Sequence, residues 1–375
     1  MTDSKVGTIE AIALLVIAML NNILLILPNH IIENSGSSAL LNTIFICLVT
    51  ALLWYIILKL MKPFLNQDIL DIANFVGGKI LKTVIGILFI TYFILIACTQ
   101  LRNFVEILKI TYFEDIPTCL LLFVFMAIAF LVSRFDISTI SRTNLIIVIL
   151  MIFDLLFIFT NISNRFVPER IFPLWGYGVK QTLFYNLTNV FAFTGLSYLY
   201  FLHPLLKKPE SFRKISFAGL IISSVFLILS IMTLLFTYAD ILSTNEIAPV
   251  FTLAKNLSLS RFFERPESLF LFAWVLTITS QLVIVLFLTS TTFTKITHLK
   301  DRKAILPTFS ILMLFIAMIP KSMTDVRFMQ NNIFQCLVIF LLYVFCPIVL
   351  ILANRKYKKL HPKGKEVNTP NEPTS

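Results

Sequence analysis

The chain has few of the residues that build metal centres, disulfides and catalytic sites. Its 375 residues include only five cysteines and four histidines. All five cysteines lie in or beside apolar runs, no C-x-x-C pair occurs, and no histidine stands at ligand spacing from a cysteine, which argues against a disulfide framework or a cysteine-based metal site. The sequence also lacks G-x-S-x-G, Walker and H-E-x-x-H motifs. We therefore expect no metal, no cofactor and no catalytic residue, and we do not expect an enzyme.

Charge is also scarce. Charged residues make up 14% of the chain and hydrophobic residues 58%, and the mean hydropathy is +0.89. This composition excludes an ordinary water-soluble domain. The apolar residues form continuous runs instead of alternating with polar ones, which indicates membrane-spanning helices and not barrel strands.

Ten apolar runs are candidates to cross the roughly 30 Å of membrane hydrocarbon. The first is too long for a removable signal and lacks a cleavage pattern, so we expect it to stay in the protein. The sequence predicts an all-α polytopic membrane protein with ten transmembrane helices in a single domain, 1–353, and a poorly ordered polar tail, 354–375. The expected spans are 9–27, 39–61, 80–101, 116–132, 145–162, 183–202, 215–237, 269–293, 305–319 and 333–352.

The distribution of Lys and Arg predicts the orientation. Counted over alternate connections, 21 of the 31 basic residues fall on the side of the N-terminus and 10 on the other side. Both termini should therefore be cytoplasmic. Because the basic residues are dispersed among short loops, the net charge of +11 does not indicate nucleic-acid binding. The tail segment RKYKKLHPKGK either touches anionic membrane lipid or is a plain stop-transfer flank.

The number of spans predicts an internal repeat. Ten spans divide into two sets of five, at about 9–162 and 183–352. A repeat with an odd number of spans enters the membrane from opposite sides, so the two halves should be inverted. Inverted repeats place a ligand site near the midplane, where the first helix of each half is interrupted.

Polar residues interrupt the first span of each predicted half. Asn21 and Asn22 lie inside the first span, ahead of Pro28, and Thr194 and Gly195 lie inside the sixth. One interpretation is that both spans are broken helices that hold a ligand. The other is that their small polar groups only form hydrogen bonds with neighbouring helices.

The third span carries a polar stripe. Tyr92, Thr99, Asn103 and Glu106 follow one another at spacings of seven, four and three residues, which places them on one helical face. Arg102 stands four residues before Glu106 and could pair with it. Glu106 is then either a functional charge of the site or part of a salt-bridged helix end.

The eighth span carries a similar stripe. Glu267, Trp274, Thr277 and Gln281 recur at seven, three and four residues, with Ser280 beside them. Thr277, Ser280 and Gln281 lie deep enough to meet the ammonium or carboxylate of a ligand, although Gln281 could equally join two helices. Glu267 is expected to compensate the charge of the helix N-terminus.

Asp154 lies within the fifth span, in the run LIIVILMIFDLLFIFTNI. A carboxylate at mid-bilayer costs about 2.5–3.5 kcal/mol on insertion scales, so an intramembrane acid is a functional candidate by default. It could bind a proton or cation, or it could be a protonated side chain bonded to a neighbouring helix.

Two stretches resemble a known family. LRNFVEILKITYFEDIP, at 101–117, and FFERPESLFLFAWVL, at 262–276, are similar to the spore germination permeases, the B subunits of nutrient germinant receptors. These belong to the amino acid/polyamine/organocation transporter superfamily. The resemblance implies a LeuT-like 5+5 inverted-repeat fold and a germinant pocket formed by spans one, three, six and eight. It also implies assembly with an A subunit and a lipoprotein C subunit in the spore inner membrane.

One position departs from the superfamily pattern. Transporters of this superfamily usually carry a Gly-rich unwound segment in the first span, where this chain has Asn21-Asn22. The acidic position of the family's third helix maps to Glu106.

The resulting hypothesis is a ligand-sensing membrane subunit. A small nutrient, most plausibly an amino acid, would bind between the first and sixth spans, where Phe193, Thr194 and Gly195 would offer backbone groups and an aromatic lid. A proton- or sodium-coupled amino acid permease would share the same fold. A third interpretation, an assembly scaffold, predicts that substitutions at Thr194 or Thr277 leave the nutrient response intact.

Overall fold

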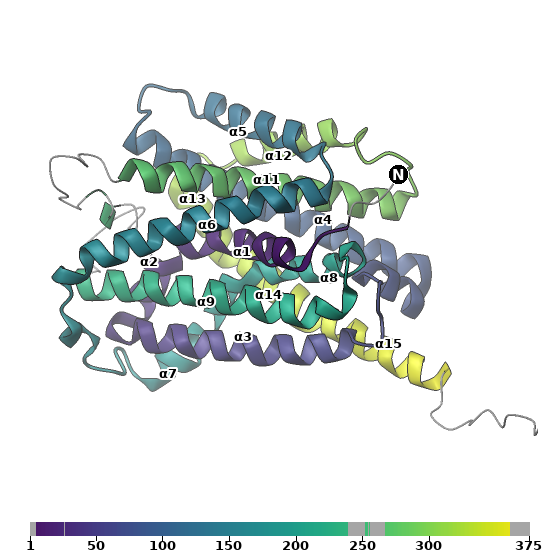
Figure 1. Cartoon of the computed structure of the whole chain (residues 1–375), viewed down its shortest axis with the longest axis horizontal. Helices are drawn as coiled ribbons and strands as arrows, with labels where there is room; N and C mark the ends of the chain where they lie inside the picture. The colour runs from purple at the N-terminus through teal and green to yellow at the C-terminus, as the bar shows by residue number, and fades with distance from the viewer. Residues whose placement is uncertain (1–4, 26, 239–251, 254, 256–266, 361–375) are drawn as a thin grey trace, which may run out of the picture.

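The computed structural model describes residues 5–25, 27–238, 252–253, 255 and 267–360. Within these residues the chain is a bundle of helices with one isolated parallel β-bridge, between Val6 and Leu206. Most of the long helices run along the longest axis of the molecule (Figure 1). The principal elements are α1 (Thr8–Leu25), α2 (Leu27–Ser35), α3 (Ala39–Met61), α4 (Ile69–Thr111), α5 (Thr118–Ser133), α6 (Ile137–Ile162), α7 (Val179–Leu183), η4 (Tyr185–Tyr198), α8 (Leu199–Leu202), α9 (Phe212–Thr237), α11 (Glu267–Thr297), α12 (Leu306–Met318), α13 (Met323–Phe328), η7 (Met329–Phe334), α14 (Gln335–Ile339), η8 (Phe340–Phe345) and α15 (Cys346–Leu360).

The helices have the length and composition of membrane spans. In the described part of the chain, six helical segments are long and apolar enough to cross a membrane. Three shorter apolar helices accompany them, at Thr8–Ile23, Thr118–Ser133 and Leu306–Met318. The chain is therefore an all-helical polytopic membrane protein, as the sequence predicts, and the count of ten transmembrane helices stays a prediction.

Two of the predicted spans depart from continuous α-helix. The sixth consists of α7, the 3₁₀-helical η4 and α8. In the tenth, the π-helical segments η7 and η8 flank α14. Such departures from α-helical bonding are tolerated at membrane depth where the backbone is buried within protein.

α4 begins earlier and ends later than the predicted span at 80–101. Asp68 starts it with a capping box, in which the Asp68 carboxylate accepts from the Asp71 N–H at 2.9 Å and the Asp71 carboxylate accepts from the Asp68 N–H at 3.3 Å. The helix is then broken at Gly77 and Gly78, and Gly78 has a φ of 68°. Glycine adopts this left-handed conformation without the steric cost of a side chain. The first turns of α4 therefore form a separate short helix.

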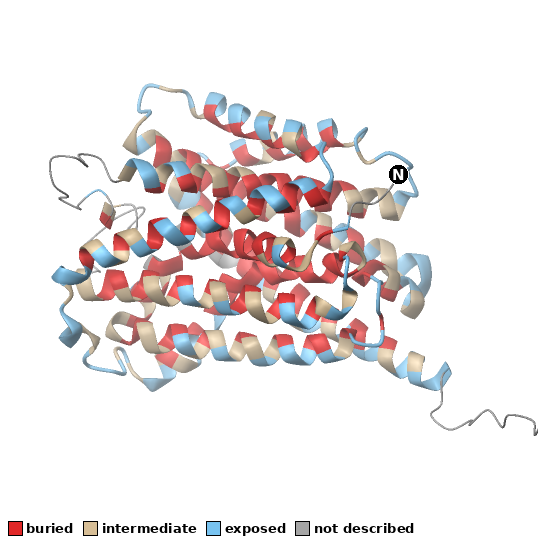
Figure 2. Ribbon diagram, in the orientation of Figure 1, coloured by how far each residue is buried: buried red, intermediate tan, exposed pale blue. Residues whose placement is uncertain are grey.

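α1 lies in the interior of the bundle. All its residues from Ala13 to Ile23 are buried, and Figure 2 shows buried residues concentrated through the centre of the molecule. A helix that is apolar on every side is expected to be surrounded by protein. α1 packs against α6, α9, η4 and α11. The central position of α1 brings its two asparagines to the middle of the molecule.

The C-terminal helix continues into the predicted tail. α15 runs to Leu360, so the part of the tail from Asn354 to that residue is helical, against the prediction, whereas residues 361–375 lie outside the described residues. Asn354 Nδ2 donates to the Leu60 carbonyl at 2.7 Å, and Lys356 Nζ donates to the Phe75 carbonyl at 2.6 Å. These contacts fasten the end of α15 to the bundle.

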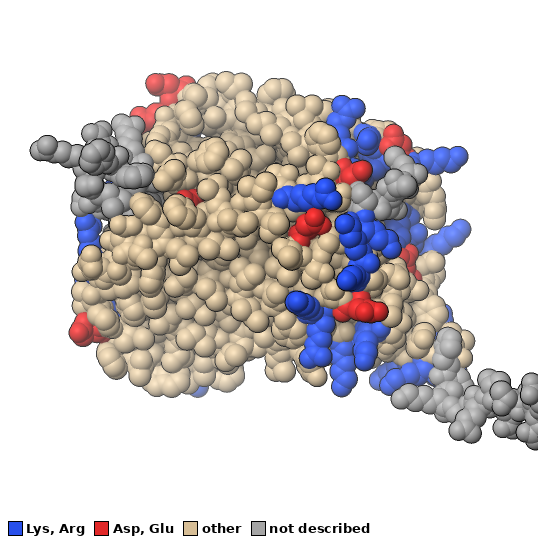
Figure 3. All heavy atoms as spheres, in the orientation of Figure 1, with Lys and Arg blue, Asp and Glu red and all other residues tan. Residues whose placement is uncertain are grey.

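Lys and Arg gather at one end of the molecule. Figure 3 shows them around the end where the start of α1 and the end of α15 lie, while the middle of the displayed face carries almost no charge. The first and the last described helices thus have their outer ends at the same, basic end. The assignment of this end to the cytoplasm stays a prediction.

Candidate functional site

A buried polar cluster joins α1, α4 and η4. The Asn22 amide on α1 donates to Thr194 Oγ1 at 2.7 Å and accepts from Gln100 Nε2 on α4. The Tyr92 hydroxyl, also on α4, lies 3.0 Å from both the Thr194 carbonyl oxygen and Ser197 Oγ. Three separate segments are therefore held together by side chains that a purely apolar core would not require.

A second polar group joins α1 to α11. Asn21 Nδ2 donates to Gln281 Oε1 and to the Thr277 carbonyl oxygen, the latter at 3.3 Å. Ser280, which precedes Gln281 in α11, donates to Asn144 Oδ1 of α6. Adjacent asparagines of α1 thus serve two different helices, and the structure brings together the predicted site residues of spans one, three, six and eight.

A small cavity lies on the α4 side of Asn22. Its volume is about 10 Å³, which is room for about one water molecule. Three of the predicted site residues line it, namely Asn22, Tyr92 and Thr99. The other lining residues are Ile96, Gln100, Phe191, Gln330, Phe334, Leu337 and Val338.

The remaining predicted site residues do not line this cavity. Thr277, Ser280 and Gln281 face the second polar group, and the Thr277 hydroxyl donates to the Ala273 carbonyl of its own helix at 2.8 Å. Phe193 is fully buried, and the aromatic side chain of η4 that borders the cavity is Phe191. The role of Phe193 as a lid stays a prediction.

Several buried polar atoms around the cluster lack hydrogen-bond partners among the described residues. They are Asn21 Oδ1, Gln100 Oε1, Asn103 Oδ1, Asn144 Nδ2 and Gln281 Nε2. A buried polar atom left unpaired costs about 1–3 kcal/mol. The cluster therefore has unused donors and acceptors that a polar solute or water could satisfy.

The backbones of α1 and η4 approach each other closely at Gly195. A Cβ atom at this position would lie 2.7 Å from the Ala18 carbonyl carbon and oxygen. Phe193, two residues earlier, leaves helical geometry with φ −99° and ψ 25°. The carbonyl of the next residue, Thr194, accepts from the Tyr92 hydroxyl at 3.0 Å.

The two asparagines lie in helical backbone. Asn21 and Asn22 are both within α1, which is described to Leu25, and α2 is described from Leu27, while residue 26 lies outside the described residues. The asparagines therefore offer amide side chains to the site, rather than an unwound backbone.

Glu106 is paired and lies away from the cavity. Arg102 Nη2 lies 2.7 Å from Glu106 Oε1, and both side chains are largely buried, which confirms the expected pairing. Arg102 Nη2 also lies 3.4 Å from the Lys321 carbonyl oxygen. Asn103, on the same part of α4, donates to Gln330 Oε1 at 3.3 Å, and Gln330 borders the cavity. Asn103 and Gln330 thus connect the charged end of α4 to the cavity wall.

Asp154 is buried and unpaired. It lies on α6, its relative exposure is 3%, and its Oδ2 atom has no hydrogen-bond partner among the described residues. The Oδ2 atom therefore gives no support to the interpretation of Asp154 as a protonated side chain that is hydrogen-bonded to a neighbouring helix. Asp154 does not line the cavity.

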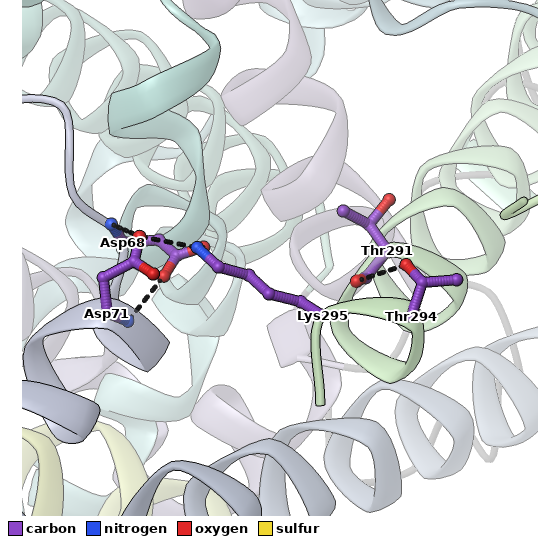
Figure 4. Close-up of polar contacts among 5 residues, drawn as sticks. All are labelled: Asp68, Asp71, Thr291, Thr294 and Lys295. Carbon is purple, nitrogen blue, oxygen red and sulfur yellow. Dashed lines mark hydrogen bonds and ion pairs between the residues drawn. The ribbon is translucent and has the colours of Figure 1, made fainter. Parts of the chain in front are cut away.

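A charged cluster lies between α4 and α11 at the basic end of the molecule. Figure 4 shows Lys295 of α11 reaching Asp68 and Asp71, with Nζ at 2.6 Å from Asp68 Oδ2 and 2.5 Å from Asp71 Oδ2. The Lys295 side chain is 29% exposed and the Asp68 side chain 8%. The cluster joins the start of α4 to the end of the helix that carries Gln281.

Sequence reasoning missed several residues of the site. Gln100 stands eight residues after Tyr92, which places it on the same helical face, so its polarity in an apolar span was a usable signal. Asn144 and Gln330 lie at or beyond the edges of the predicted spans, where polar residues are ordinary, and Phe191 is one of many phenylalanines. The contact of Lys295 with Asp68 and Asp71 joins residues far apart in the chain, and no local pattern predicts it.

Comparison with solved structures shows the fold. The chain resembles a Na⁺-coupled sialic acid symporter in a substrate-bound outward-open state, with a TM-score of 0.64 and 11% identity over 92% of this chain and 78% of that one. The likeness extends over nearly the whole bundle. The architecture is therefore that of a polytopic membrane transporter.

Comparison with characterised sequences shows the family. The chain is 20% identical to spore germination protein GerQB of Bacillus cereus, over 86% of this chain and 88% of the relative. It is 22% identical to spore germination protein YndE of Bacillus subtilis (strain 168), over 95% of this chain and 98% of the relative. It is also 22% identical to spore germination protein B2 of the same strain, over 87% and 89%. The model of the spore permease family, described as spore germination protein, matches residues 5–326, and the chain belongs to this family.

Proposed function

We propose that this protein is the solute-binding membrane subunit of a spore nutrient germinant receptor. In this proposal residues 1–353 form ten transmembrane helices in two inverted five-helix repeats, both termini are cytoplasmic, and the protein lies in the spore inner membrane. It signals through an A subunit and a lipoprotein C subunit. Membership of the spore germination family and the transporter fold support this proposal.

The observation that carries the proposal is the polar cluster at the junction of α1, α4, η4 and α11. Asn21 and Asn22 connect to Gln281, Gln100 and Thr194 in the interior of the bundle. A cluster that served only to fasten helices would be expected to satisfy its own polar atoms. Here several amide atoms remain unpaired among the described residues.

The chemistry of the cluster indicates a small solute without net charge. The described residues that line the cavity include no charged side chain, and the amides of Asn22, Gln100 and Gln330 can each donate and accept. Amide oxygens suit an ammonium group and amide N–H groups suit a carboxylate. The zwitterion of an amino acid offers both groups, and we therefore retain an amino acid as the nutrient.

Binding requires a change of conformation. Ligand sites usually have volumes of about 300–1,000 Å³, and this cavity has about 10 Å³. An amino acid enters only if α1, η4 or η7 moves away from α4. A nutrient that binds the opened state more tightly than the closed state shifts the protein toward it, and that shift is the signal passed to the partner subunits.

The proposal is tested by binding to the purified full-length protein. A panel of amino acids is screened for stabilisation against heat, and the active compound is then measured with N22L and with T160V. Thr160 is exposed on α6 and its hydroxyl donates only within its own helix, to the Leu156 and Phe157 carbonyls, so T160V is a control for the loss of a polar group. We expect N22L to abolish the stabilisation and T160V to retain it. Equal stabilisation of both variants would overturn the proposal.

A coupled amino acid permease is the second candidate, and the unpaired Asp154 favours it. A buried carboxyl without a partner can take up and release a proton or bind a cation during a transport cycle. Proteoliposomes that contain only this chain would show uptake of labelled amino acid driven by a proton or sodium gradient. The gradient dependence should disappear in D154N. Absence of uptake, together with loss of a spore's response to one nutrient on deletion of the gene, would favour the receptor.

A further inference from the structure

An apolar groove lies between α5 and α12, apart from the polar cluster. Its volume is about 260 Å³, and its walls include Phe123 and Phe130 from α5 and Pro307 and Ile311 from α12. Among the described residues of the wall, Ser310 alone has a polar side chain, and its hydroxyl donates to the Leu306 carbonyl of its own helix at 2.8 Å. Phe123 and Ile311 are more than half exposed, at 57% and 55%. The groove therefore opens on the outside of the bundle, where membrane hydrocarbon surrounds the protein.

The groove is short and apolar. The α5 wall extends from Phe123 to Phe130, which is about 10 Å of helix at the usual rise. A segment of one hydrocarbon chain suits a space of this length with these walls. A helix of another protein packed over the open groove is the alternative, and the experiment below separates it from a lipid.

Basic side chains surround the end of the groove at the Lys/Arg-rich end of the molecule. Arg302 donates to the Ser133 carbonyl at 2.9 Å and to the Phe135 carbonyl at 3.3 Å, and so ties the loop before α12 to the end of α5. The Arg134 guanidinium lies 5.9 Å from the centre of the Phe130 ring, in the groove wall. Lys303 lies in the same loop, three residues before α12 begins at Leu306.

The available charge at this mouth is positive. Arg134 and Lys303 are both exposed and form no ion pair among the described residues. Asp136 and Asp301, the acids of these loops, lie near Arg302 and favour its charged form. Arg302 is occupied by the carbonyls of the α5 end, so Arg134 and Lys303 are the cations free to bind an anion.

We propose that this groove is a binding site for an anionic phospholipid. One acyl chain lies along Phe123, Phe130 and Ile311, and the phosphate is bound by Arg134 and Lys303. A basic residue near a membrane surface attracts an anionic lipid, and an apolar groove at hydrocarbon depth is filled by hydrocarbon. α5 and α12 both pack on α4 and α11, which carry Gln100 and Gln281, so the lipid would stabilise the helices that hold the polar cluster.

Lipid retention on the purified full-length protein tests the proposal. The protein is exchanged into detergent with either phosphatidylglycerol or phosphatidylcholine, and bound lipid is counted by native mass spectrometry. We expect about a tenfold to thirtyfold preference for phosphatidylglycerol, the effect of two basic residues of ordinary strength at a membrane surface. The double variant R134Q/K303Q should lose this preference, while K207Q/K208Q, which removes the same charge from exposed positions elsewhere in the chain, should keep it.

A second variant tests the groove itself. A127F places a ring in the groove wall and should reduce the binding of both lipids, without requiring any change to the charged residues. Equal binding of both lipids by the unmodified protein would overturn the proposal, as would equal effects of the two double variants. Competition by glycerol phosphate without acyl chains would identify a free phosphate site instead. Unchanged lipid binding in A127F, with loss of a co-purifying subunit, would identify a docking site for a protein and would also overturn it.

Discussion

The hydrogen bond between Asn22 and Thr194 gives the sharpest test of the polar cluster. It joins the first helix of one predicted repeat to that of the other, with Asn22 Nδ2 2.7 Å from Thr194 Oγ1 and both residues buried. N22L removes the amide and T194V removes only the hydroxyl, and both replacements are close in size to the original residues. A double-mutant cycle over these two positions isolates the energy of their contact.

The expected size follows from measurements on other membrane proteins. Hydrogen bonds between buried side chains in membranes contribute about 0.6 kcal/mol on average and up to about 1.7 kcal/mol. The Asn22–Thr194 bond is short and lies far from water, so we expect a coupling energy in the upper half of that range, about 1–1.7 kcal/mol. N22L alone should cost more than T194V alone, because it also deprives Gln100 of its acceptor.

The free energy of unfolding of the purified protein, measured by titration with denaturing detergent, provides the readout. The same cycle with N22L and T160V is the control, because the Thr160 hydroxyl bonds only within α6. That control cycle should be additive to within about 0.3–0.5 kcal/mol. Additivity of N22L and T194V to the same precision would refute the role assigned to this contact.

Three further predictions concern other parts of the structure. G195A puts a methyl group against the backbone of α1 and should destabilise the protein by about 1–3 kcal/mol, so an unchanged thermal midpoint would contradict the close approach. K295M breaks two partly buried ion pairs and should lower the free energy of unfolding by about 1–3 kcal/mol. This is below the 3–5 kcal/mol of a fully buried pair because Lys295 is 29% exposed. The control K300M, at an exposed position, should change the free energy of unfolding by less than about 0.5 kcal/mol. Burial lowers the pKa of His203, whose Nδ1 accepts from the Asn66 N–H at 2.8 Å. The unfolded chain therefore binds a proton more readily than the folded chain, so the stability of the protein should fall as the pH drops below about 6.5. H203Q should remove that part of the pH dependence of the thermal midpoint.

Much of the architecture follows from the sequence because the membrane imposes it. Continuous apolar runs can be satisfied in lipid only by helices or closed barrels, so the class of fold was predictable from hydropathy alone. The stripe of Tyr92 and Thr99 was also predictable, because helical spacing places both on one face. Within the site, the pairing of Arg102 with Glu106 followed from their four-residue separation.

The details of the site depend on long-range packing, which the sequence does not display. Whether Asn22 faces α4 or α11 is decided by how α1 rotates among α6, α9, η4 and α11, and a change of one residue reverses the assignment. Phe191, and not Phe193, borders the present cavity, and the register of η4 that decides this is not visible in the sequence. The early start of α4 was also missed, because hydropathy averaged over a window of residues does not detect a capping box at Asp68 or a glycine pair that separates two helices.

The most direct test is a structure of the full-length protein determined with a saturating concentration of the amino acid that stabilises it against heat. We expect density for one small solute between α1, α4 and η4, in contact with the side chains of Asn22 and Gln100. We also expect a cavity more than tenfold larger than the 10 Å³ of the present conformation. Density for the amino acid elsewhere, with Asn22 still bonded to Thr194 and Gln100, would contradict the role assigned to the polar cluster.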